Sequence, residues 1–132
     1  MIREFALQTS ARSQLVDITG IVEGFVRETD VKSGICVVYT PHTTAAVTIN
    51  ENADPTVKAD IVQKLGELIP KEGGFKHTEG NSDSHIKSSL VGSSVTLIIE
   101  NGALILGTWQ GIFFCEFDGR RSRKYYVKIV GG

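Results

Sequence analysis

The chain has 132 residues, 41% of them hydrophobic, which is enough for one domain with a buried core. Its 14 Lys and Arg residues nearly balance 15 Asp and Glu residues, and the formal net charge of −1 excludes a general attraction to nucleic acid or to an anionic membrane. No stretch approaches the ~20 apolar residues of a membrane span, and residues 1–15 lack the apolar core of a signal peptide. We therefore expect one cytoplasmic domain, residues 1–132, with no nucleic-acid or membrane partner.

Two local patterns organise the first part of the chain. Residues 2–8 are rich in β-forming side chains and precede a polar stretch, which predicts a first strand. Apolar residues then recur at helical spacing from Ile18 to Val26, which predicts a helix that Asp17 caps and that ends before Ser33.

Two β-rich runs follow, at residues 34–40 and 43–50. Only Pro41 and His42 separate them, so the spacing predicts an antiparallel pair with His42 at its turn. Alternation in the second run predicts a core face formed by Ala45, Val47 and Ile49. The opposite, unusually polar face carries Thr44, Ala46, Thr48 and Asn50.

Asp54 followed by Pro55 is a strong helix-start signal. The helix that it predicts has a buried apolar stripe formed by Val57, Ile61, Leu65 and Leu68.

A shorter helix is expected to end at Leu90. Asn81 or Ser82 can cap it, and Ile86 and Leu90 are spaced for an apolar contact within it.

The C-terminal third carries strand signals only, and its Asn101-Gly102 pair favours a hairpin turn. The expected strands cover residues 94–100, 103–106, 108–117 and 123–130. The order of elements predicts an α+β fold in which a largely antiparallel sheet packs with two or three helices.

The two cysteines are expected to be buried free thiols. Cys36 and Cys115 each lie in an apolar, strand-like run without a CxxC partner or an adjacent histidine. A disulfide between them is the weaker alternative.

The polar segment 77–90 holds two of the three histidines of the chain. His42, His77 and His85 all lie in polar, strand-end or loop-to-helix positions, and none lies on an apolar stripe. Neutral imidazoles bind zinc, and imidazoles with a carboxylate suit other divalent ions. We interpret the three histidines as a shared pocket for a divalent metal, zinc or magnesium. The alternative is three separate surface histidines.

Carboxylates border the same segments. Glu51 follows the second β-rich run, and Glu79 lies beside His77. Both are candidates for acid-base catalysis, and Glu51 is the stronger one because the sequence shows no structural role for it. Asp54 is better explained as a helix cap.

Four positive charges fall within residues 120–124. Arginine makes paired hydrogen bonds to phosphate, so this run predicts a phosphate or pyrophosphate site. The alternative is a charged hairpin tip that keeps a sheet edge soluble.

Trp109 and Gln110 also have two interpretations. Trp109 can stack on a ligand while the amide of Gln110 hydrogen-bonds to it, or Trp109 can lie in the core with Gln110 on the surface. The sequence alone favours the core tryptophan.

Three motifs, in this order and spacing, give the chain a resemblance to a known family. They are PHTTAAVTINE at 41–51, HTEGNSDSHIKSSLVG at 77–92 and GTWQGIFFCEFDGRRSR at 107–123. Together they resemble the YjbQ family, small bacterial and archaeal proteins often described as secondary thiamine-phosphate synthases. The resemblance implies a single α+β domain that assembles as a homotrimer, with a histidine-lined, metal-binding pocket near the subunit interfaces.

The resemblance also implies a set of site residues. The metal ligands would be His42, His77 and His85. The catalytic residues would be Glu51, Glu79 and His77. The substrate-binding residues would be Thr44, Asn50, Asn81, Trp109, Gln110, Arg121 and Arg123.

We therefore expect an enzyme that acts on a small phosphorylated metabolite, with thiamine-phosphate synthesis as the implied reaction. That reaction releases pyrophosphate, whose charge arginines and a divalent metal would stabilise. The sequence has no paired-aspartate motif of the kind that chelates magnesium pyrophosphate. The alternatives are a non-catalytic binding module for a phosphorylated metabolite and a purely structural protein.

Overall fold

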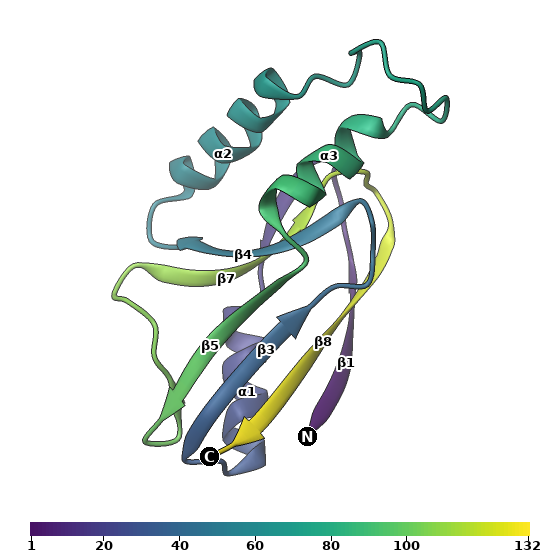
Figure 1. Cartoon of the computed structure of the whole chain (residues 1–132). Coiled ribbons are helices and arrows are strands. Elements are labelled where there is room, and N and C mark those ends of the chain that lie inside the picture. The colour runs from purple at the N-terminus through teal and green to yellow at the C-terminus, as the bar shows by residue number, and fades with distance from the viewer.

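Eight strands and three helices make up the computed structural model, which describes residues 1–132 (Figure 1). In chain order the elements are β1 (Ile2–Gln8), β2 (Gln14–Asp17), α1 (Thr19–Thr29), β3 (Ser33–Tyr39), β4 (Ala45–Glu51), α2 (Pro55–Leu68), α3 (Ser82–Val91), β5 (Ser94–Glu100), β6 (Ala103–Leu104), β7 (Gln110–Glu116) and β8 (Ser122–Gly131). The predicted α+β class is confirmed. The four-residue strand β2 was not predicted.

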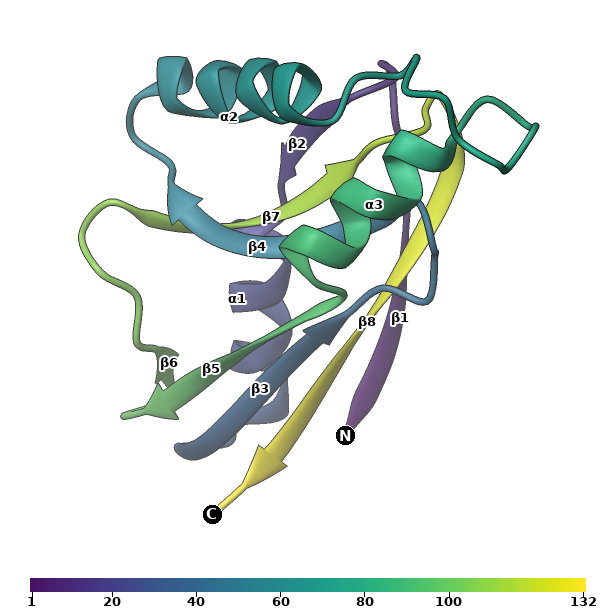
Figure 2. The same cartoon turned by 45° about the horizontal axis from the view of Figure 1, so that its top comes forward.

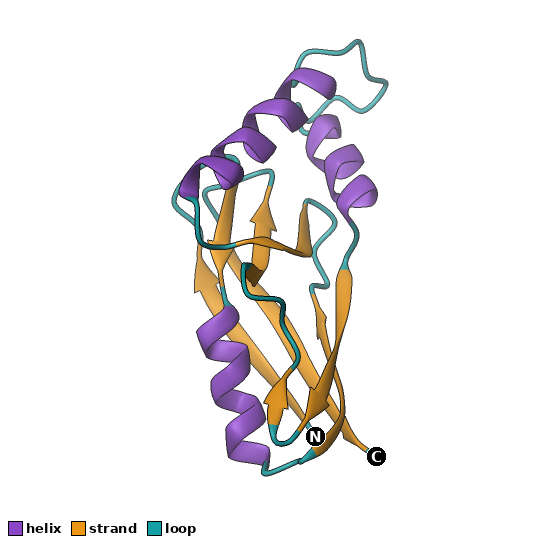
Figure 3. Cartoon of the chain, turned by 90° about the vertical axis from the view of Figure 1, so that its left-hand side faces the viewer, coloured by secondary structure: helices purple, strands orange, loops and turns teal.

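The strands form two antiparallel sheets rather than one. The larger sheet has the order β1-β8-β3-β5-β6, and the smaller has the order β2-β7-β4. The main core lies between the two sheets and includes the buried face of α1, which runs alongside them (Figure 3). A second, smaller core lies on the other side of β7, where α2 and the end of α3 cover it (Figure 2).

The predicted hairpin of residues 34–40 and 43–50 is wrong. β3 pairs with β5 and β8, whereas β4 pairs with β7, so the connection through His42 passes from one sheet to the other. A two-residue hairpin needs positive φ at its turn, and Pro41 cannot adopt it because its ring fixes φ near −65°. The short connection therefore marks a crossing between layers and leaves His42 at the edge of both sheets.

The charged run at 118–124 crosses between the sheets in the same way. β7 pairs with β2 and β4, whereas β8 pairs with β1 and β3, so the run is not the tip of a hairpin. The two crossings bring the end of β3 and the end of β7 to the same corner of the molecule.

The face of β4 that was expected to be polar is covered at the start of the strand, whereas Asn50 near its end is exposed. Ala45 and Val47 lie in the main core as predicted, but Ala46 lies in the second core with Phe113 and Cys115. β7, the middle strand of the smaller sheet, is consequently buried on both faces.

α2 begins as predicted, because Asp54 accepts a hydrogen bond from the N–H of Thr56 at 2.9 Å. Its apolar stripe is only partly covered. Ile61 and Leu65 pack against the second core, no residue of the helix is fully buried, and Leu68 is 74% exposed.

α3 buries its polar face. Asp83, Ser84, Lys87 and Ser88 are buried, whereas Ile86 and Leu90 are exposed. The helix starts at Ser82, and the N-cap residue Asn81 makes no side-chain capping bond.

Several local predictions are confirmed. Asp17 accepts a hydrogen bond from the N–H of Thr19 at the start of α1, at 2.9 Å, although the N-cap position itself is Ile18 and not Asp17 as predicted. Asn101 and Gly102 have φ of 53° and 75° and connect the paired strands β5 and β6. Cys36 and Cys115 are buried free thiols, and burial raises their pKa values to about 11 and about 12. No helix has the length and apolar character needed to cross a membrane.

Candidate functional site

A pocket lined only by polar residues lies at the corner where the two sheet crossings meet. We call it the polar pocket; its volume is about 240 Å³. Its lining comes from the connection after β3, from the start of α3 and the loop before it, and from the connection between β7 and β8. The lining residues are His42, Thr43, Thr44, Glu79, Asn81, His85, Asp118, Arg121 and Arg123. Seven of these were predicted; Thr43 and Asp118 were not.

The proton of His42 is fixed by the backbone of β8. The Nε2 atom of His42 accepts a hydrogen bond from the N–H of Lys124 at 3.0 Å. The Nδ1 atom therefore carries the proton and is the nitrogen left to donate to a ligand. Burial lowers the pKa of His42, and the charges of Arg123 and Lys124 lower it further against the opposing charge of Glu116. His42 is thus a neutral hydrogen-bond donor at neutral pH.

His77 lies beside the polar pocket and is not part of its lining; its ring is edge to face with that of His85, with centroids 5.6 Å apart. The Nε2 atom of His77 lies 3.1 Å from Oδ1 of Asn81. Because the amide of Asn81 donates to Asp118 at 2.9 Å, its oxygen must be the acceptor for His77. The neutral ring of His77 therefore has its free lone pair on Nδ1. The Oε2 atom of Glu79 lies 3.7 Å from Nε2 of His77.

Arg123 forms the floor of the pocket through a buried ion pair with Glu116. Its Nε donates to Oε1 of Glu116 at 2.7 Å, and its Nη2 donates to Oε2 of Glu116 and to Oγ1 of Thr44, the latter at 2.8 Å. Burial alone raises the pKa of Glu116, but hydrogen bonds from Arg123, the backbone N–H of Asp118 and Thr9 outweigh it and hold the pKa below its ordinary value. The guanidinium of Arg123 thus has partners inside the protein.

The guanidinium of Arg121 is more accessible to a ligand than that of Arg123. Its Nε donates to the backbone oxygen of Asp118 at 2.8 Å and its Nη2 to Oδ2 of Asp118 at 2.9 Å, while half of the side chain is exposed. Burial alone raises the pKa of Asp118, but hydrogen bonds from Asn81 and Arg121 outweigh it. Asp118 therefore stays ionised and orients both of these side chains.

A second ion network fixes α3. The buried carboxylate of Asp83 accepts hydrogen bonds from Nη1 and Nη2 of Arg12, each at 3.2 Å, and from Nζ of Lys87 at 3.1 Å. Arg12 also donates to the carbonyl of Gly80 at 3.4 Å. The loop that carries Glu79 and the helix that carries His85 are therefore tied to the connection between β1 and β2.

Besides Asp118, sequence reasoning missed four charged residues of these networks: Arg12, Asp83, Lys87 and Glu116. One signal was available for Glu116, a lone carboxylate in the otherwise apolar run IFFCEF. Asp83 and Lys87 are spaced i, i+4, but nothing in the sequence shows that this pair faces inward.

Four predicted site residues lie elsewhere. Asn50, Glu51, Trp109 and Gln110 are at the opposite end of β4 and β7, where Glu51 is paired with Gln110. The length of β4 separates them from His42 by about 20 Å. Trp109 is 63% exposed, so the core interpretation of this residue is wrong. A single chain therefore does not bring all the predicted site residues together.

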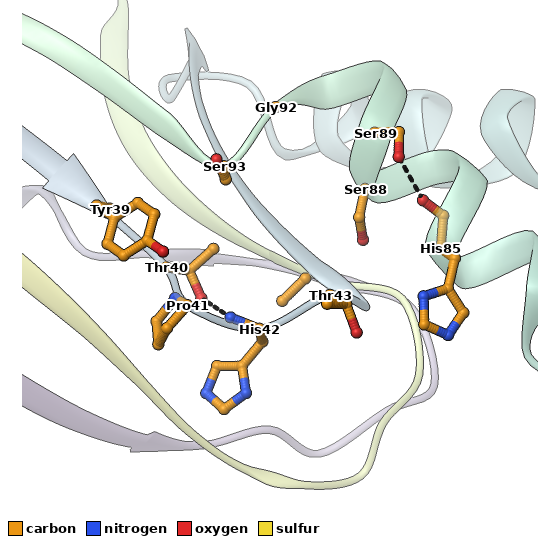
Figure 4. Close-up of a pocket in the computed structure, with 11 residues that line it drawn as sticks. Tyr39, Thr40, Pro41, His42, Thr43, His85, Ser88, Ser89, Gly92 and Ser93 are labelled. Atoms are coloured by element: carbon orange, nitrogen blue, oxygen red, sulfur yellow. Dashed lines mark hydrogen bonds between the residues drawn. The ribbon is translucent and has the colours of Figure 1, made fainter.

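A larger hollow adjoins the polar pocket (Figure 4). We call it the hydroxyl groove; its volume is about 640 Å³. Figure 4 shows His42 and Thr43 on one side and His85, Ser88 and Ser89 of α3 on the other. The remaining lining residues are Tyr39, Thr40, Pro41, Ala45, Gly92 and Ser93.

The family comparison matches almost the whole chain. The family described as "UPF0047 protein YjbQ-like" matches residues 3–132. The chain belongs to the YjbQ/UPF0047 family. This confirms the resemblance drawn from the three motifs.

Relatives of the YjbQ-like chain occur in archaea and bacteria. A UPF0047 protein of Methanocaldococcus jannaschii is 59% identical over 99% of this chain and 95% of its own length. The UPF0047 protein YugU of Bacillus subtilis is 52% identical over 99% of this chain and all of its own length.

Crystal structures of YjbQ-like proteins share the fold. One from Clostridium acetobutylicum is 57% identical, with a TM-score of 0.96 over 97% of this chain and 99% of its own. A YjbQ-like protein of unknown function from Sulfolobus solfataricus is 32% identical, with a TM-score of 0.96 over 100% of this chain and 97% of its own. The chain therefore has the YjbQ fold and belongs to the YjbQ/UPF0047 family. The names of these relatives assign no reaction to them.

Proposed function

We propose that the chain is an enzyme that acts on a small phosphorylated molecule held in the polar pocket. The composition of the pocket carries this proposal: two imidazoles, two guanidiniums and two carboxylates converge with no apolar side chain among them. Titratable groups gathered in one hollow are typical of catalytic sites.

Three features suit a phosphoryl group. Arg121 uses Nε and Nη2 on Asp118, which leaves Nη1 to donate to a ligand. His42 offers its Nδ1 proton. α3 begins at the pocket, and the partial positive charge of a helix N-terminus adds to the attraction for an anion.

His77 and Glu79 are the proposed acid-base residues. Asn81 holds the Nε2 proton of His77, so the Nδ1 lone pair is the atom that would take a proton from substrate or water. The carboxylate of Glu79 would stabilise the imidazolium that this transfer forms. Glu51 is not part of this arrangement within one chain.

We include a divalent metal, zinc or magnesium, as the alternative use of His77, with His77 and His85 as its first ligands. An ion on Nδ1 of His77 would occupy the lone pair proposed as the base and leave Glu79 as the acid-base residue. The two rings are adjacent, but no group of three or more His, Cys, Asp or Glu side chains is already arranged to hold an ion. His42 would join them only by giving up its hydrogen bond from Lys124. When bound, the ion would neutralise phosphoryl charge. Metal analysis of untagged protein should detect a divalent ion in the wild type and none in His85→Ala. Absence of metal from both proteins would rule out the metal site.

Thiamine-phosphate synthesis is the specific reaction that we propose to test first. The polar pocket offers one free guanidinium edge, on Arg121, because Arg123 is bound to Glu116. The reaction handles a diphosphate and a monophosphate together, so this sparse charge predicts a slow rate.

The expected homotrimer is also part of the proposal. Asn50, Glu51, Trp109 and Gln110 lie about 20 Å from the polar pocket of their own chain, and Trp109 is 63% exposed. A neighbouring subunit could supply this group to the pocket, which would unite all the predicted site residues. The cytoplasmic location rests on the sequence alone.

Calorimetric titration with inorganic phosphate tests the binding site. We expect the wild type to bind and Arg121→Ala to bind at least roughly 10-fold more weakly, because a charge-assisted hydrogen bond is lost. Arg27→Ala, on the exposed side of α1, is the matched control. Equal binding by Arg121→Ala and the wild type would place the phosphate elsewhere.

Turnover separates the enzyme from the alternative binding module. For the enzyme, His77→Ala should retain phosphate binding and lose the release of thiamine phosphate from the two phosphorylated precursors. Tight binding with no turnover of these or other phosphate esters by the wild type would favour the binding module, for which the pairing of both arginines with carboxylates is the supporting observation.

A further inference from the structure

The polar pocket and the hydroxyl groove are two parts of one continuous surface. His42, Thr43 and His85 line both, so these residues form the boundary between them. The groove volume of about 640 Å³ lies within the usual range for small-molecule sites. One ligand can therefore extend from the pocket into the groove.

The two hollows differ sharply in charge. The polar pocket is lined by Glu79, Asp118, Arg121 and Arg123 among others. The eleven residues of the groove include no Asp, Glu, Lys or Arg, and the burial of His42 keeps its imidazole neutral by lowering its pKa. Any ion attracted to this surface thus binds in the pocket, and the groove is left for an uncharged part of the same ligand.

Hydroxyl groups dominate the groove. Six of its eleven residues carry one: Tyr39, Thr40, Thr43, Ser88, Ser89 and Ser93. Hydroxyl oxygens accept two hydrogen bonds and donate one, so they match the hydroxyls of a ligand without adding charge.

Several of these hydroxyls retain bonding capacity. Ser88 donates to the carbonyl of Ser84 at 2.8 Å and Ser89 to the carbonyl of His85 at 3.0 Å, so the lone pairs of both oxygens remain available. Thr43 and Ser93 expose their side chains. Thr40 retains less capacity, because its hydroxyl donates to the backbone oxygen of Lys124 and accepts one hydrogen bond from the N–H of His42.

The backbone explains how the serines reach the groove. α3 ends at Val91, and Gly92, with a φ of 105°, redirects the chain. The backbone oxygen of Ser93 then accepts a hydrogen bond from the N–H of Thr40 at 2.9 Å. The end of α3 is thereby fixed against the end of β3.

We propose that the hydroxyl groove binds the polyhydroxylated, uncharged body of a sugar or polyol phosphate whose phosphoryl group lies in the polar pocket. This inference rests on the proposed function and names its substrate class. An aromatic heterocycle fits less well, because the phenol ring of Tyr39 is already stacked on Tyr126 and the hydroxyls of the groove would face the ligand unpaired. The pyrimidine and thiazole bodies of the thiamine-phosphate precursors are such heterocycles, so binding of a polyol body here counts against that specific reaction and leaves an enzyme for a phosphorylated substrate standing.

Calorimetry with three probes tests the inference: sorbitol 6-phosphate, phenyl phosphate and inorganic phosphate. All three carry the phosphoryl group, and they differ in the body that would lie in the groove. We expect sorbitol 6-phosphate to bind at least roughly 10-fold more tightly than the other two, because a site built from hydroxyls discriminates against ligands that lack them.

The variant Ser88→Ala/Ser93→Ala removes two groove hydroxyls that do not line the polar pocket. It should lose most of the preference for sorbitol 6-phosphate and bind inorganic phosphate as the wild type does. Thr96→Val, which removes an exposed hydroxyl from β5, is the control and should change neither. Thermal unfolding of each variant checks that the fold is retained.

The outcomes distinguish this inference from the proposed function. Equal affinity for all three probes, tighter binding of phenyl phosphate, or an unchanged preference in the double variant overturns the groove assignment and leaves the phosphate site standing. Failure of the wild type to bind any of the three overturns both.

Discussion

The proton on His42 decides what that side chain can do. Its Nε2 lone pair accepts the N–H of Lys124, so the residue is a donor through Nδ1 and not a ready metal ligand. His77 is the reverse case, because Asn81 holds its Nε2 proton and leaves Nδ1 as a base. The sequence predicted both histidines as site residues. The hydrogen bonds that decide which nitrogen carries the proton come from the backbone of Lys124 for His42 and from the amide oxygen of Asn81 for His77.

The Glu116–Arg123 pair predicts sensitivity to acid. The native state holds the pKa of Glu116 below its ordinary value of 4.5, so the unfolded chain binds a proton there before the folded protein does. Stability from this group is therefore present above pH 4.5 and is lost as the pH falls through the native pKa. The folded protein also lowers the pKa values of Asp83 and Asp118, so both add to the stability that is lost in acid.

Glu116→Gln should cost about 3 kcal/mol at pH 7, because it leaves the buried guanidinium of Arg123 without its counter-charge. The variant should also lose less stability than the wild type between pH 7 and pH 3. Urea unfolding at several pH values measures both effects, and parallel curves for the two proteins would show that Glu116 does not titrate differently in the folded state.

At the scale of elements, α3 is held by charge rather than by an apolar stripe. Burial alone would raise the pKa of Asp83, but the hydrogen bonds from Arg12 and Lys87 outweigh it, and the carboxylate stays ionised inside the structure. The helix presents His85, Ser88 and Ser89 to the site from this anchor. Its docking therefore sets the positions of both hollows.

Asp83→Asn should loosen α3 selectively. Lys87 would keep its buried charge without a counter-ion, and the bidentate contact to Arg12 would be lost. Hydrogen exchange followed by mass spectrometry should show at least roughly tenfold faster exchange for residues 80–91 and little change in β3 and β8. Asp60→Asn, on the exposed face of α2, is the control. Unchanged protection of residues 80–91 would show that the network does not anchor the helix.

The elements also show how far the sequence could lead. Signals that act within a few residues were read correctly: Asp54-Pro55 starts α2, and Asn101-Gly102 connects β5 and β6. The pairing of β3 with β8 joins residues nearly 100 positions apart, and no local pattern encodes it. The polar face of α3 is buried because Arg12, 71 residues away, meets Asp83.

At the scale of the whole molecule, apolar side chains remain uncovered. Ile35 of β3 is paired with Ile98 of β5 and Val130 of β8, and all three are more than 40% exposed on the outer face of the larger sheet. Contiguous exposed apolar residues mark interaction surfaces. Exposure of Trp109 was not predicted because a large apolar side chain gives the same sequence signal whether it lies in the core or on the surface.

The proposed trimer predicts a solution mass three times the 14.3 kDa of the chain. Ile98→Lys should shift the mass to that of the monomer, because it places a charge in the apolar face that the assembly would bury. Light scattering after size-exclusion chromatography measures both. Lys128→Glu, which changes a charge on the same face, is the comparison. A monomeric wild type would contradict the assembly and the sharing of Trp109 between subunits.

The central claim is that a phosphoryl group binds between Arg121 and the histidines of the polar pocket. Side-chain ¹⁵N NMR during a phosphate titration tests it most directly, because only three histidines contribute signals. We predict that His42 keeps its proton on Nδ1, and that the signals of His42 and His85 move with one shared dissociation constant that rises in Arg121→Ala. Saturable phosphate binding with all three histidines unmoved would contradict the account.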